Sequence, residues 1–224
     1  MRYDFDEIIS RQDTDSIKWT GRPEVNYKIP PLNEILPMWI ADMDFKSSPK
    51  IIEAMTEIAQ FGNYGYSKIP DSAYNAVINW MKTRHNWEID RDWVIFMPGA
   101  VAAGHLGVQA MTQPGDHVIL QPPVYYPFYR TVLNNGCHLD LNPLKISGLK
   151  YKLDLENFKE LAKNPRSSMF ILCSPHNPAG RVWTREELRE LGEICLNEDV
   201  FILSDELHSD LIMPGFKHVP FASI

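Results

Sequence analysis

Two short apolar runs, each followed by a polar residue with side-chain hydrogen-bonding capacity, constrain the fold of this chain most strongly. Met169–Cys173 ends a few residues before Asn177, and Val200–Leu203 ends two residues before Asp205. Continuous apolar runs of this length, bounded by turn residues, indicate strands that are buried on both faces of a parallel sheet. The carboxyl ends of neighbouring parallel strands meet at the crevice where such sheets bind ligands. We therefore expect Asn177 and Asp205 to face one site.

Helix and strand patterns alternate along most of the chain. A first helix is predicted to begin at Ser48, with Pro49 at its first position, and to end at Gly62. Further helices are predicted at 71–85, 100–111, 126–135, 154–163 and 184–197, and strands at 93–97, 117–121, 137–141, 168–173 and 200–203. This alternation predicts an α/β fold, in which helices cover both faces of a mainly parallel sheet.

Composition excludes several classes of protein. A net charge of −7 over 224 residues, without a long basic run, argues against a nucleic-acid surface. No apolar stretch reaches the roughly 18 residues of a membrane span, and the acidic amino terminus lacks the apolar core of a signal peptide. Three widely spaced cysteines indicate reduced, buried thiols, so we expect a cytoplasmic protein. The histidines show no paired spacing, and no metal site is predicted.

The segment from Gly99 to Gly104 follows a predicted strand and opens a helix. Its small residues and free amide groups suit an anion at the helix start. It is not a Walker A loop, because His105 follows Gly104, and it is not a dinucleotide fingerprint, because position 101 is Val. Close packing of the helix on the sheet is the alternative explanation.

Several motifs together resemble the pyridoxal-phosphate (PLP) enzymes of the aspartate-aminotransferase fold, known as aminotransferase class I/II or fold type I. The motifs are Trp39–Phe45, Pro123–Phe128, Ser174–Arg181 and Ser204–His208. Within that superfamily the chain is most similar to the carbon–sulfur β-lyases of the cystathionine β-lyase and cystalysin type. The resemblance implies PLP as cofactor, a cystathionine-like or cysteine-like amino acid as substrate, and pyruvate, ammonia and a thiol as products.

The resemblance also implies a domain organisation and an assembly. Residues 48–224 would form the N-terminal part of the PLP-binding large domain, and residues 1–47 would pack with a small domain. The protein would be a homodimer with shared active sites, because the residue matching Tyr66 in the family reaches the cofactor phosphate of the neighbouring subunit. An exposed aromatic residue in a glycine-containing loop is the alternative for Tyr66.

Four residues receive cofactor-binding roles from the family pattern. Asp205 would keep the pyridine nitrogen protonated, and Asn177 would donate a hydrogen bond to the phenolic oxygen. Ala100 and Val101 would donate backbone hydrogen bonds to the phosphate. A helix cap is the alternative for Asp205, and an Asn-Pro turn is the alternative for Asn177.

The remaining site residues are less specific. Tyr125 would stack on the cofactor ring, although aromatic core filling is the alternative. Tyr126 would lie close to the substrate as a candidate catalytic residue, and Ala41 would lie by the substrate carboxylate, unless its segment is an ordinary turn. His208 would be a further cofactor-binding residue, and it stands where many aminotransferases carry Tyr, which favours the lyase branch.

The lysine that forms the Schiff base in this family is expected beyond Ile224. Lys217 lies in a segment before the expected loop, so we do not assign it this role. We therefore expect the chain to be a catalytically incomplete part of a longer enzyme. An aminotransferase of the same fold and a non-catalytic binding or regulatory protein are the alternatives, and Val101 disfavours an NAD-dependent oxidoreductase.

Overall fold

The structure is a computed structural model that describes residues 3–11, 14–20 and 36–224. It divides into two compact units, Met1–Lys68 and Ile69–Ile224. The boundary expected at residue 47 concerns packing with a small domain, and it stays a prediction.

The first unit contains α1 (Ile17–Thr20) and α2 (Pro49–Phe61). The predicted start and end of α2 are confirmed, since Ser48 is the N-cap, Pro49 lies in the first turn and Gly62 ends the helix. Gly62 adopts a left-handed φ of 71°, and its N–H donates to the carbonyl of Ile58. Glycine suits this position because a Cβ would strain the left-handed conformation.

The second unit is built on a four-stranded parallel sheet, ordered β2-β1-β5-β6. The strands are β1 (His117–Leu120), β2 (His138–Leu141), β5 (Ser167–Cys173) and β6 (Phe201–Asp205). The central strand β5 consists mainly of buried apolar residues. Such a run is typical of a strand covered on both faces.

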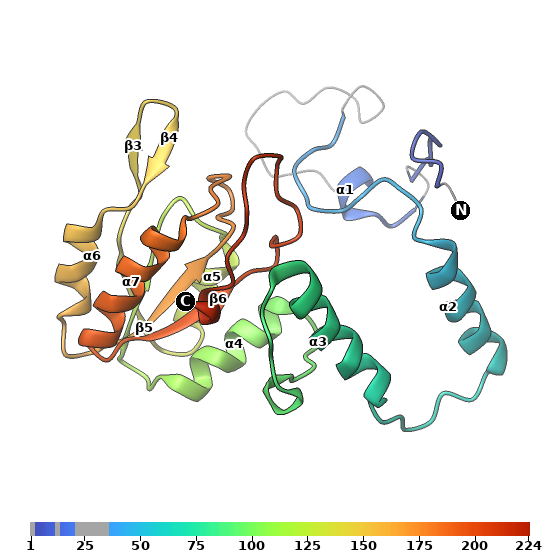
Figure 1. The fold of residues 1–224 in the computed structure, drawn as a ribbon, viewed down its shortest axis with the longest axis horizontal. Helices are drawn as coiled ribbons and strands as arrows, with labels where there is room; N and C mark the ends of the chain where they lie inside the picture. The colour runs from blue at the N-terminus through green and yellow to red at the C-terminus, as the bar shows by residue number, and fades with distance from the viewer. Residues whose placement is uncertain (1–2, 12–13, 21–35) are drawn as a thin grey trace. The chain divides into compact units, whose positions relative to one another are not determined.

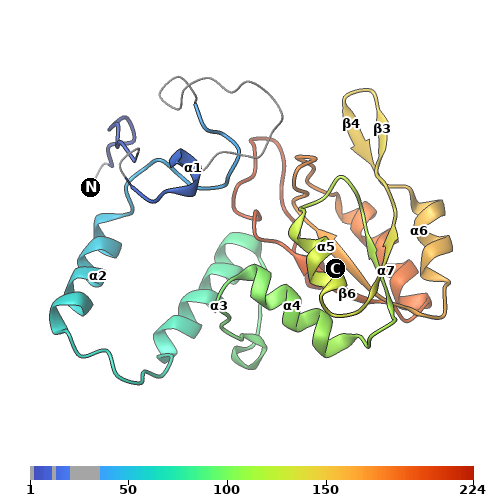
Figure 2. The ribbon, with the colours of Figure 1, turned by 180° about the vertical axis from the view of Figure 1, so that it is seen from behind.

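Helices cover both faces of this sheet, which confirms the predicted α/β fold. On one face lie α4 (Ala100–Met111) and α5 (Pro127–Leu133), and on the other α6 (Leu155–Ala162) and α7 (Arg185–Asn197). Helices α6 and α7 lie in front of the sheet in Figure 1, and α5 lies in front of it when seen from behind in Figure 2.

Side chains alternate along the two central strands between the two cores. On β5, Met169 and Ile171 join the core under α4 and α5, whereas Phe170 and Leu172 join the core under α6 and α7. On β6, Leu203 packs against the first core and Ile202 against the second. This alternation follows from the two-residue period of an extended strand, and it fixes the face on which each later residue lies.

The helix limits follow local capping signals. Helix α3 (Asp71–His85) has the predicted bounds and ends at Asn86, which adopts a left-handed φ of 52°. Helix α7 starts at a complete capping box, in which Thr184 accepts from the backbone of Glu187 and Glu187 accepts from the backbone of Thr184. Two short 3-10 helices, η2 (Arg91–Trp93) and η3 (Phe221–Ser223), complete the helical elements of this unit.

Two features of the chain differ from the prediction. The strand expected at 93–97 is wrong, because residues 94–97 follow η2 as a segment that pairs with no described strand. An antiparallel hairpin of β3 (Lys145–Ser147) and β4 (Lys150–Lys152) was not predicted. Its turn contains Gly148 at φ 61°, which is the signal of a tight hairpin that sequence reading could have used.

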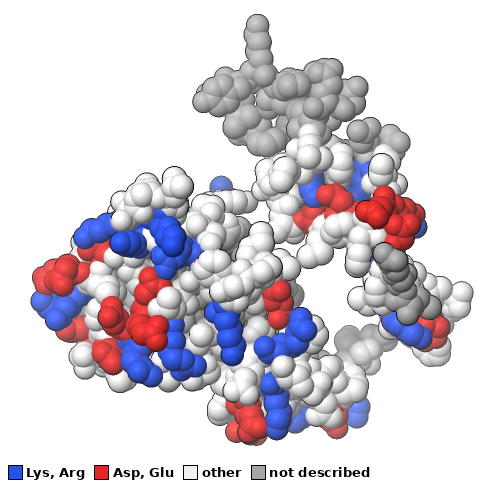
Figure 3. Space-filling model, turned by 45° about the horizontal axis from the view of Figure 1, so that its top comes forward, with Lys and Arg blue, Asp and Glu red and all other residues white. Residues whose placement is uncertain are grey.

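Surface and thiol properties agree with the composition. All three cysteines are free and buried, which confirms that expectation. Among the described residues, no helix combines the length and apolar character needed to cross a membrane. On the face of the second unit seen in Figure 3, Lys and Arg are interspersed with Asp and Glu.

Candidate functional site

The carboxyl ends of β1 and β5 mark the point where the sheet topology changes direction. The chain passes from β1 outward to β2, then crosses back to β5 on the other side of β1. Ligand sites of open α/β sheets lie at such switch points. The loops that follow β1 and β5 are joined there, because the Nε2 of His176 lies 3.0 Å from the carbonyl oxygen of Pro123.

A hollow of about 230 Å³ opens beside this edge of the sheet, within the second unit. Ala100, Val101, Tyr125 and Asp205 all line it. An adjoining hollow of about 280 Å³ shares Ala100, Phe128 and Asp205 with the first. Four of the residues predicted from separate motifs to bind one cofactor thus line one cavity.

The start of α4 forms the wall of the hollow that suits an anion. Its N-cap, Gly99, adopts a φ of 105° and makes no side-chain cap. A Cβ at Gly99 would meet no atom within 4 Å, so the glycine is required by backbone conformation and leaves open space before the helix. The first amide groups of a helix have no intrahelical partner, and the helix dipole makes this end positive.

Asp205 supplies the negative charge of the hollow. It ends β6 two residues after Leu203, so its side chain lies on the face covered by α4 and α5. Its Oδ1 accepts a hydrogen bond of 3.0 Å from the N–H of Leu207, and its carbonyl accepts one of 2.9 Å from Ser174. The backbone and one carboxylate oxygen are therefore fixed, which leaves Oδ2 without a partner among the described residues.

Tyr125 brings a half-buried aromatic ring to the same hollow. Its ring contacts Phe128 edge to face, with centroids 5.6 Å apart. Burial raises the pKa of the Tyr125 hydroxyl, and the neighbouring Tyr126 and Asp205 raise it further. The electrostatic influence of Asp205 on this hydroxyl indicates that the ring and the carboxylate share one environment.

Sequence reading missed Cys173, which lies beside Asp205. The two residues are register partners at the ends of β5 and β6. The Sγ of Cys173 accepts a hydrogen bond of 3.3 Å from the N–H of Asn177, so the thiol fixes the loop that carries this predicted residue. Burial raises the pKa of Cys173 to about 12, with a smaller contribution from Asp205. The signal available was that Cys173 ends its apolar run, whereas Asp205 lies two residues beyond the end of the neighbouring run.

Asn177 and His208 lie elsewhere at this edge of the sheet. Both line a separate hollow of about 720 Å³, together with parts of the β3–β4 hairpin and the 211–216 segment. Neither residue lines the hollow that contains Asp205. The predicted hydrogen bond from Asn177 to the cofactor therefore stays a prediction, as does a role for His208.

Of the three remaining predicted residues, one lies in the second unit without lining the hollow, and two lie in the first unit. Tyr126 is 73% exposed, and its ring lies 5.6 Å from that of Tyr125. Ala41 and Tyr66 belong to the first unit and are exposed there. Their predicted roles with substrate or with a neighbouring subunit stay predictions.

The turn around Ala41 is nevertheless well held within the first unit. The N–H of Asp42 donates to the carbonyl of Ile40 at 2.9 Å. The nearly buried Lys18 donates to the carbonyl of Asp42 at 2.5 Å and to Asp44 at 2.7 Å, and Arg11 pairs with Asp42 at 2.7 Å. Hydrogen bonds from Lys18 and Trp19 lower the pKa of Asp44.

Among the described residues, no group of histidine, cysteine and acidic side chains could hold a metal ion. The chemistry available at the site is therefore that of an anion-binding helix start, an aromatic ring and a carboxylate. This set suits a flat, anionic organic molecule with a basic nitrogen.

Comparison with known proteins identifies the family. The model of the family "Aminotransferase class I and II" matches residues 34–223. The chain belongs to this family. The predicted membership in the aminotransferase class I/II superfamily is thereby confirmed, and the α/β fold agrees with it.

The most similar relatives of this aminotransferase-family chain include carbon–sulfur lyases. It is 44% identical over 220 residues to cystathionine beta-lyase PatB of Bacillus subtilis (strain 168), which covers 98% of this chain and 56% of PatB. The structure of cystalysin from Treponema denticola, which contains a pyridoxal 5'-phosphate cofactor, aligns over 100% of this chain and 56% of that chain, with a TM-score of 0.90 and 38% identity.

The PLP-bound C-S lyase from Staphylococcus hominis gives a similar alignment. It covers 99% of this chain and 56% of that chain, with a TM-score of 0.88 and 30% identity. The chain thus spans little more than half the length of these relatives.

Proposed function

We propose that this chain is the cofactor-binding part of a PLP-dependent carbon–sulfur β-lyase. Its substrate is a cystathionine-like or cysteine-like amino acid, and its products are pyruvate, ammonia and a thiol. The observation that carries the proposal is the hollow lined by Ala100, Val101, Tyr125 and Asp205. The names of the relatives support the lyase reaction.

The residues of the hollow fit PLP in their chemistry. The open space at Gly99 and the amide groups at the start of α4 suit a phosphate. The Asp205 carboxylate has one oxygen free of any described partner and suits a protonated ring nitrogen. The Tyr125 ring supplies an aromatic face for a flat heterocycle.

PLP supplies an electron sink for the α-carbon of an amino acid. The residues of this chain hold and tune it. An ionised carboxylate raises the pKa of a base at contact range, so Asp205 would keep a proton on the ring nitrogen. Ala100 and Val101 would hold the phosphate through their amide groups, and Tyr125 would cover one face of the ring. We assign no group of this chain to removal of the α-proton.

The proposal extends to assembly and location. We infer that the protein forms a homodimer in which Tyr66 contributes to the neighbouring active site, and that it acts in the cytoplasm. The exposure of Tyr66 is compatible with a contact to a second subunit. Loss of PLP affinity in a Tyr66→Ala variant with unchanged folding, measured together with the mass of the protein in solution, tests this part.

The reaction is tested with the full-length protein reconstituted with PLP. Incubation with L-cystathionine is expected to release pyruvate without an added keto acid. The Asp205→Asn variant is expected to release it about 100-fold more slowly, the scale of losing one preorganised electrostatic contact. Asp199→Asn is the matched control, because Asp199 is exposed and its φ of 56° suits Asn.

Other outcomes distinguish the alternatives. Amino transfer to an added keto acid, without pyruvate release from cystathionine, would make the protein an aminotransferase of the same fold. Binding of PLP without either reaction would make it a binding protein. Failure to bind PLP would contradict the proposal at its foundation.

A further inference from the structure

Glu206, the residue after Asp205, is the centre of a hydrogen-bond network that the proposed chemistry does not use. Its Oε1 accepts a hydrogen bond of 2.8 Å from the hydroxyl of Ser204 and one of 2.7 Å from the N–H of Phe221. Its Oε2 lies 2.9 Å from the Nε2 of His218. One carboxylate thus connects the end of β6 to His218 and Phe221, some fifteen residues further along the chain.

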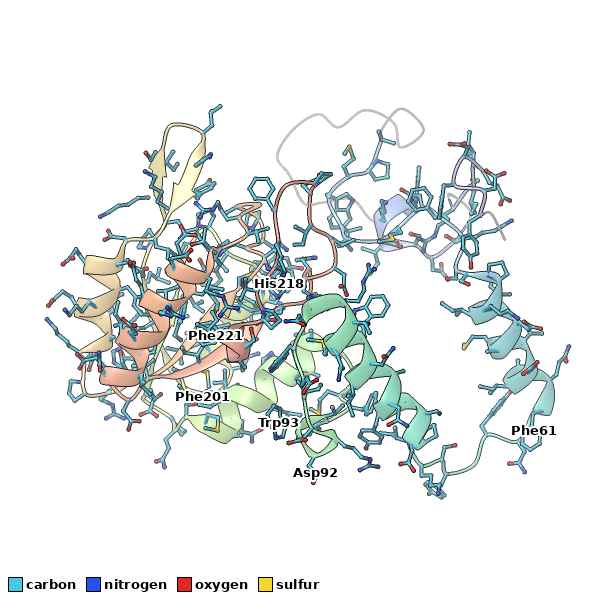
Figure 4. The ribbon with its side chains drawn as sticks, in the orientation of Figure 1. Phe61, Asp92, Trp93, Phe201, His218 and Phe221 are labelled. Atoms are coloured by element: carbon cyan, nitrogen blue, oxygen red, sulfur yellow. The ribbon has the colours of Figure 1, made fainter. Side chains whose placement is uncertain are left out.

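His218 is buried in this network, with a side chain that is only 2% exposed. Its Nδ1 is buried and has no hydrogen-bond partner among the described residues. Because a carboxylate can only accept, the Nε2 of His218 carries the proton and donates it to Glu206. His218 and Phe221 are labelled in Figure 4, beside β6.

The network begins beside the hollows, since Ser204 and Glu206 line the one of about 280 Å³ together with Asp205. Ile202 and Phe221 pack against the core under α6 and α7, and Leu203 packs against the core under α4 and α5. Since side chains alternate along a strand, the side chain of Ser204 lies on the opposite face of β6 from that of Asp205, and Glu206 follows the end of the strand. The Ser204–Glu206 hydrogen bond agrees with this arrangement.

We propose that Glu206, anchored by Ser204, His218 and Phe221, is a positioning residue that fixes the direction of the Asp205 carboxylate. The inference rests on the proposed function, because it assumes that Asp205 contacts PLP. Hydrogen bonds hold the residues on both sides of Asp205 in the chain. The backbone at Asp205 is therefore less free to rotate. The carboxylate is then held toward the hollow before any ligand arrives, which lowers the entropic cost of binding.

The chain beyond Asp205 needs such an anchor. Residues 207–210 form turns and lie outside the sheet, and Leu207, Leu211, Met213 and Phe216 are all exposed. Packing therefore contributes little to the position of this segment. The buried contacts of Glu206 with His218 and Phe221 connect it back to the core.

A second acid–histidine pair nearby offers a matched control. The Nε2 of His85 lies 3.0 Å from Oδ1 of Asp210, whose Oδ2 accepts a hydrogen bond of 2.9 Å from Trp80. This pair ties the same segment to α3. The His85 ring packs edge to face on His218, with centroids 5.6 Å apart, but the pair makes no hydrogen bond with Glu206. Substitution of Asp210 therefore measures the effect of a more mobile segment in general. Substitution of Glu206 measures the effect of a more mobile Asp205.

The test measures the Kd of the full-length protein for PLP by absorbance titration, together with the thermal unfolding midpoint. Glu206→Ala is expected to raise the Kd about tenfold, the scale seen when the outer partner of a binding group is lost. Glu206→Gln keeps acceptors for Ser204 and Phe221, so its Kd is expected within about threefold of wild type. Asp210→Asn is expected within about twofold, because it leaves every hydrogen bond of Glu206 in place and Asp210 reaches the network only through the rings of His85 and His218.

Each result supports or contradicts the positioning role of Glu206. Wild-type affinity in Glu206→Ala overturns it, as does an equal loss in Asp210→Asn or no recovery in Glu206→Gln. If Glu206→Ala does not fold, Ser204→Ala replaces it, with an expected rise in Kd of at least about twofold; an unchanged Kd then overturns the anchor. Wild-type protein that does not bind PLP overturns the proposed function itself, which separates the two failures.

Discussion

Cys173 and Asp205 lie opposite each other as the last residues of the neighbouring parallel strands β5 and β6. Both lie on the face of the sheet that α4 and α5 cover, so a buried thiol adjoins the carboxylate that lines the candidate cofactor site. The thiol also accepts the N–H of Asn177. The two strand ends and the start of the loop after β5 are thereby joined at one point.

The environment of Cys173 predicts an unreactive thiol. Burial raises the pKa of Cys173 and of Cys195 to about 12 from the ordinary 9.0. Because the thiolate is the nucleophile, neither cysteine should react with iodoacetamide at pH 8 in the folded protein, and both should react in urea. Mass-spectrometric mapping of the adducts measures this. Rapid labelling of Cys173 in the native state would contradict the buried geometry.

The same thiols predict how stability depends on pH. Between pH 9.0 and about 12 the folded state keeps protons that the unfolded state has lost. The free energy of unfolding is therefore unaffected by these groups below that window and falls as the pH rises through it. Urea unfolding at several pH values tests this prediction. A Cys195→Ala variant should show a shallower decline than wild type, and an identical decline would count against burial as the cause.

Substitutions of Tyr125 test whether its aromatic ring or its hydroxyl contributes to PLP binding. Tyr125→Phe keeps the ring in the hollow, so the Kd for PLP should stay within about twofold of wild type, whereas Tyr125→Ala should raise it by up to about tenfold. Tyr126→Ala is the control, because Tyr126 is exposed and does not line the hollow. Equal losses in the Phe and Ala variants would show that the hydroxyl, not stacking, holds the cofactor.

Two glycines of α4 test how closely this helix packs on β6. A Cβ at Gly107 would lie 2.4 Å from Cδ1 of Leu203, whereas a Cβ at Gly104 would lie 3.7 Å from Thr131. Gly107→Ala should therefore lower the free energy of unfolding by about 1–3 kcal/mol through overpacking. Gly104→Ala should raise it by up to about 1 kcal/mol through helix propensity. Equilibrium urea unfolding compares them, and equal effects would contradict the close α4–β6 contact.

Much of the fold could be predicted because its signals are local. Pro49 and Gly62 delimit α2, and the Thr184–Glu187 capping box starts α7, without reference to the rest of the chain. The strand expected at 93–97 failed because a strand needs a hydrogen-bonding neighbour, and an apolar sequence does not specify one. The β3–β4 hairpin was missed because its three-residue strands are short and largely exposed.

The candidate site could be predicted only in part. Ala100, Val101, Tyr125 and Asp205 were assigned from motifs, and the sheet topology brings them to one hollow. Asn177 and His208 share a different hollow, since the loops after the strands diverge beyond the sheet. The roles of Cys173 and Glu206 depend on strand register and on contacts with His218 and Phe221, which no local pattern records.

The central claim is that the carboxylate of Asp205 lies against the ring nitrogen of PLP. Nitrogen-15 NMR of PLP labelled at this nitrogen, bound to the full-length protein, measures its protonation directly. Wild-type protein should show the chemical shift of a protonated pyridine well above the pH at which free pyridine loses its proton, and Asp205→Asn should lose that signal. An unprotonated nitrogen in wild type, or an unchanged signal in Asp205→Asn, would contradict the account.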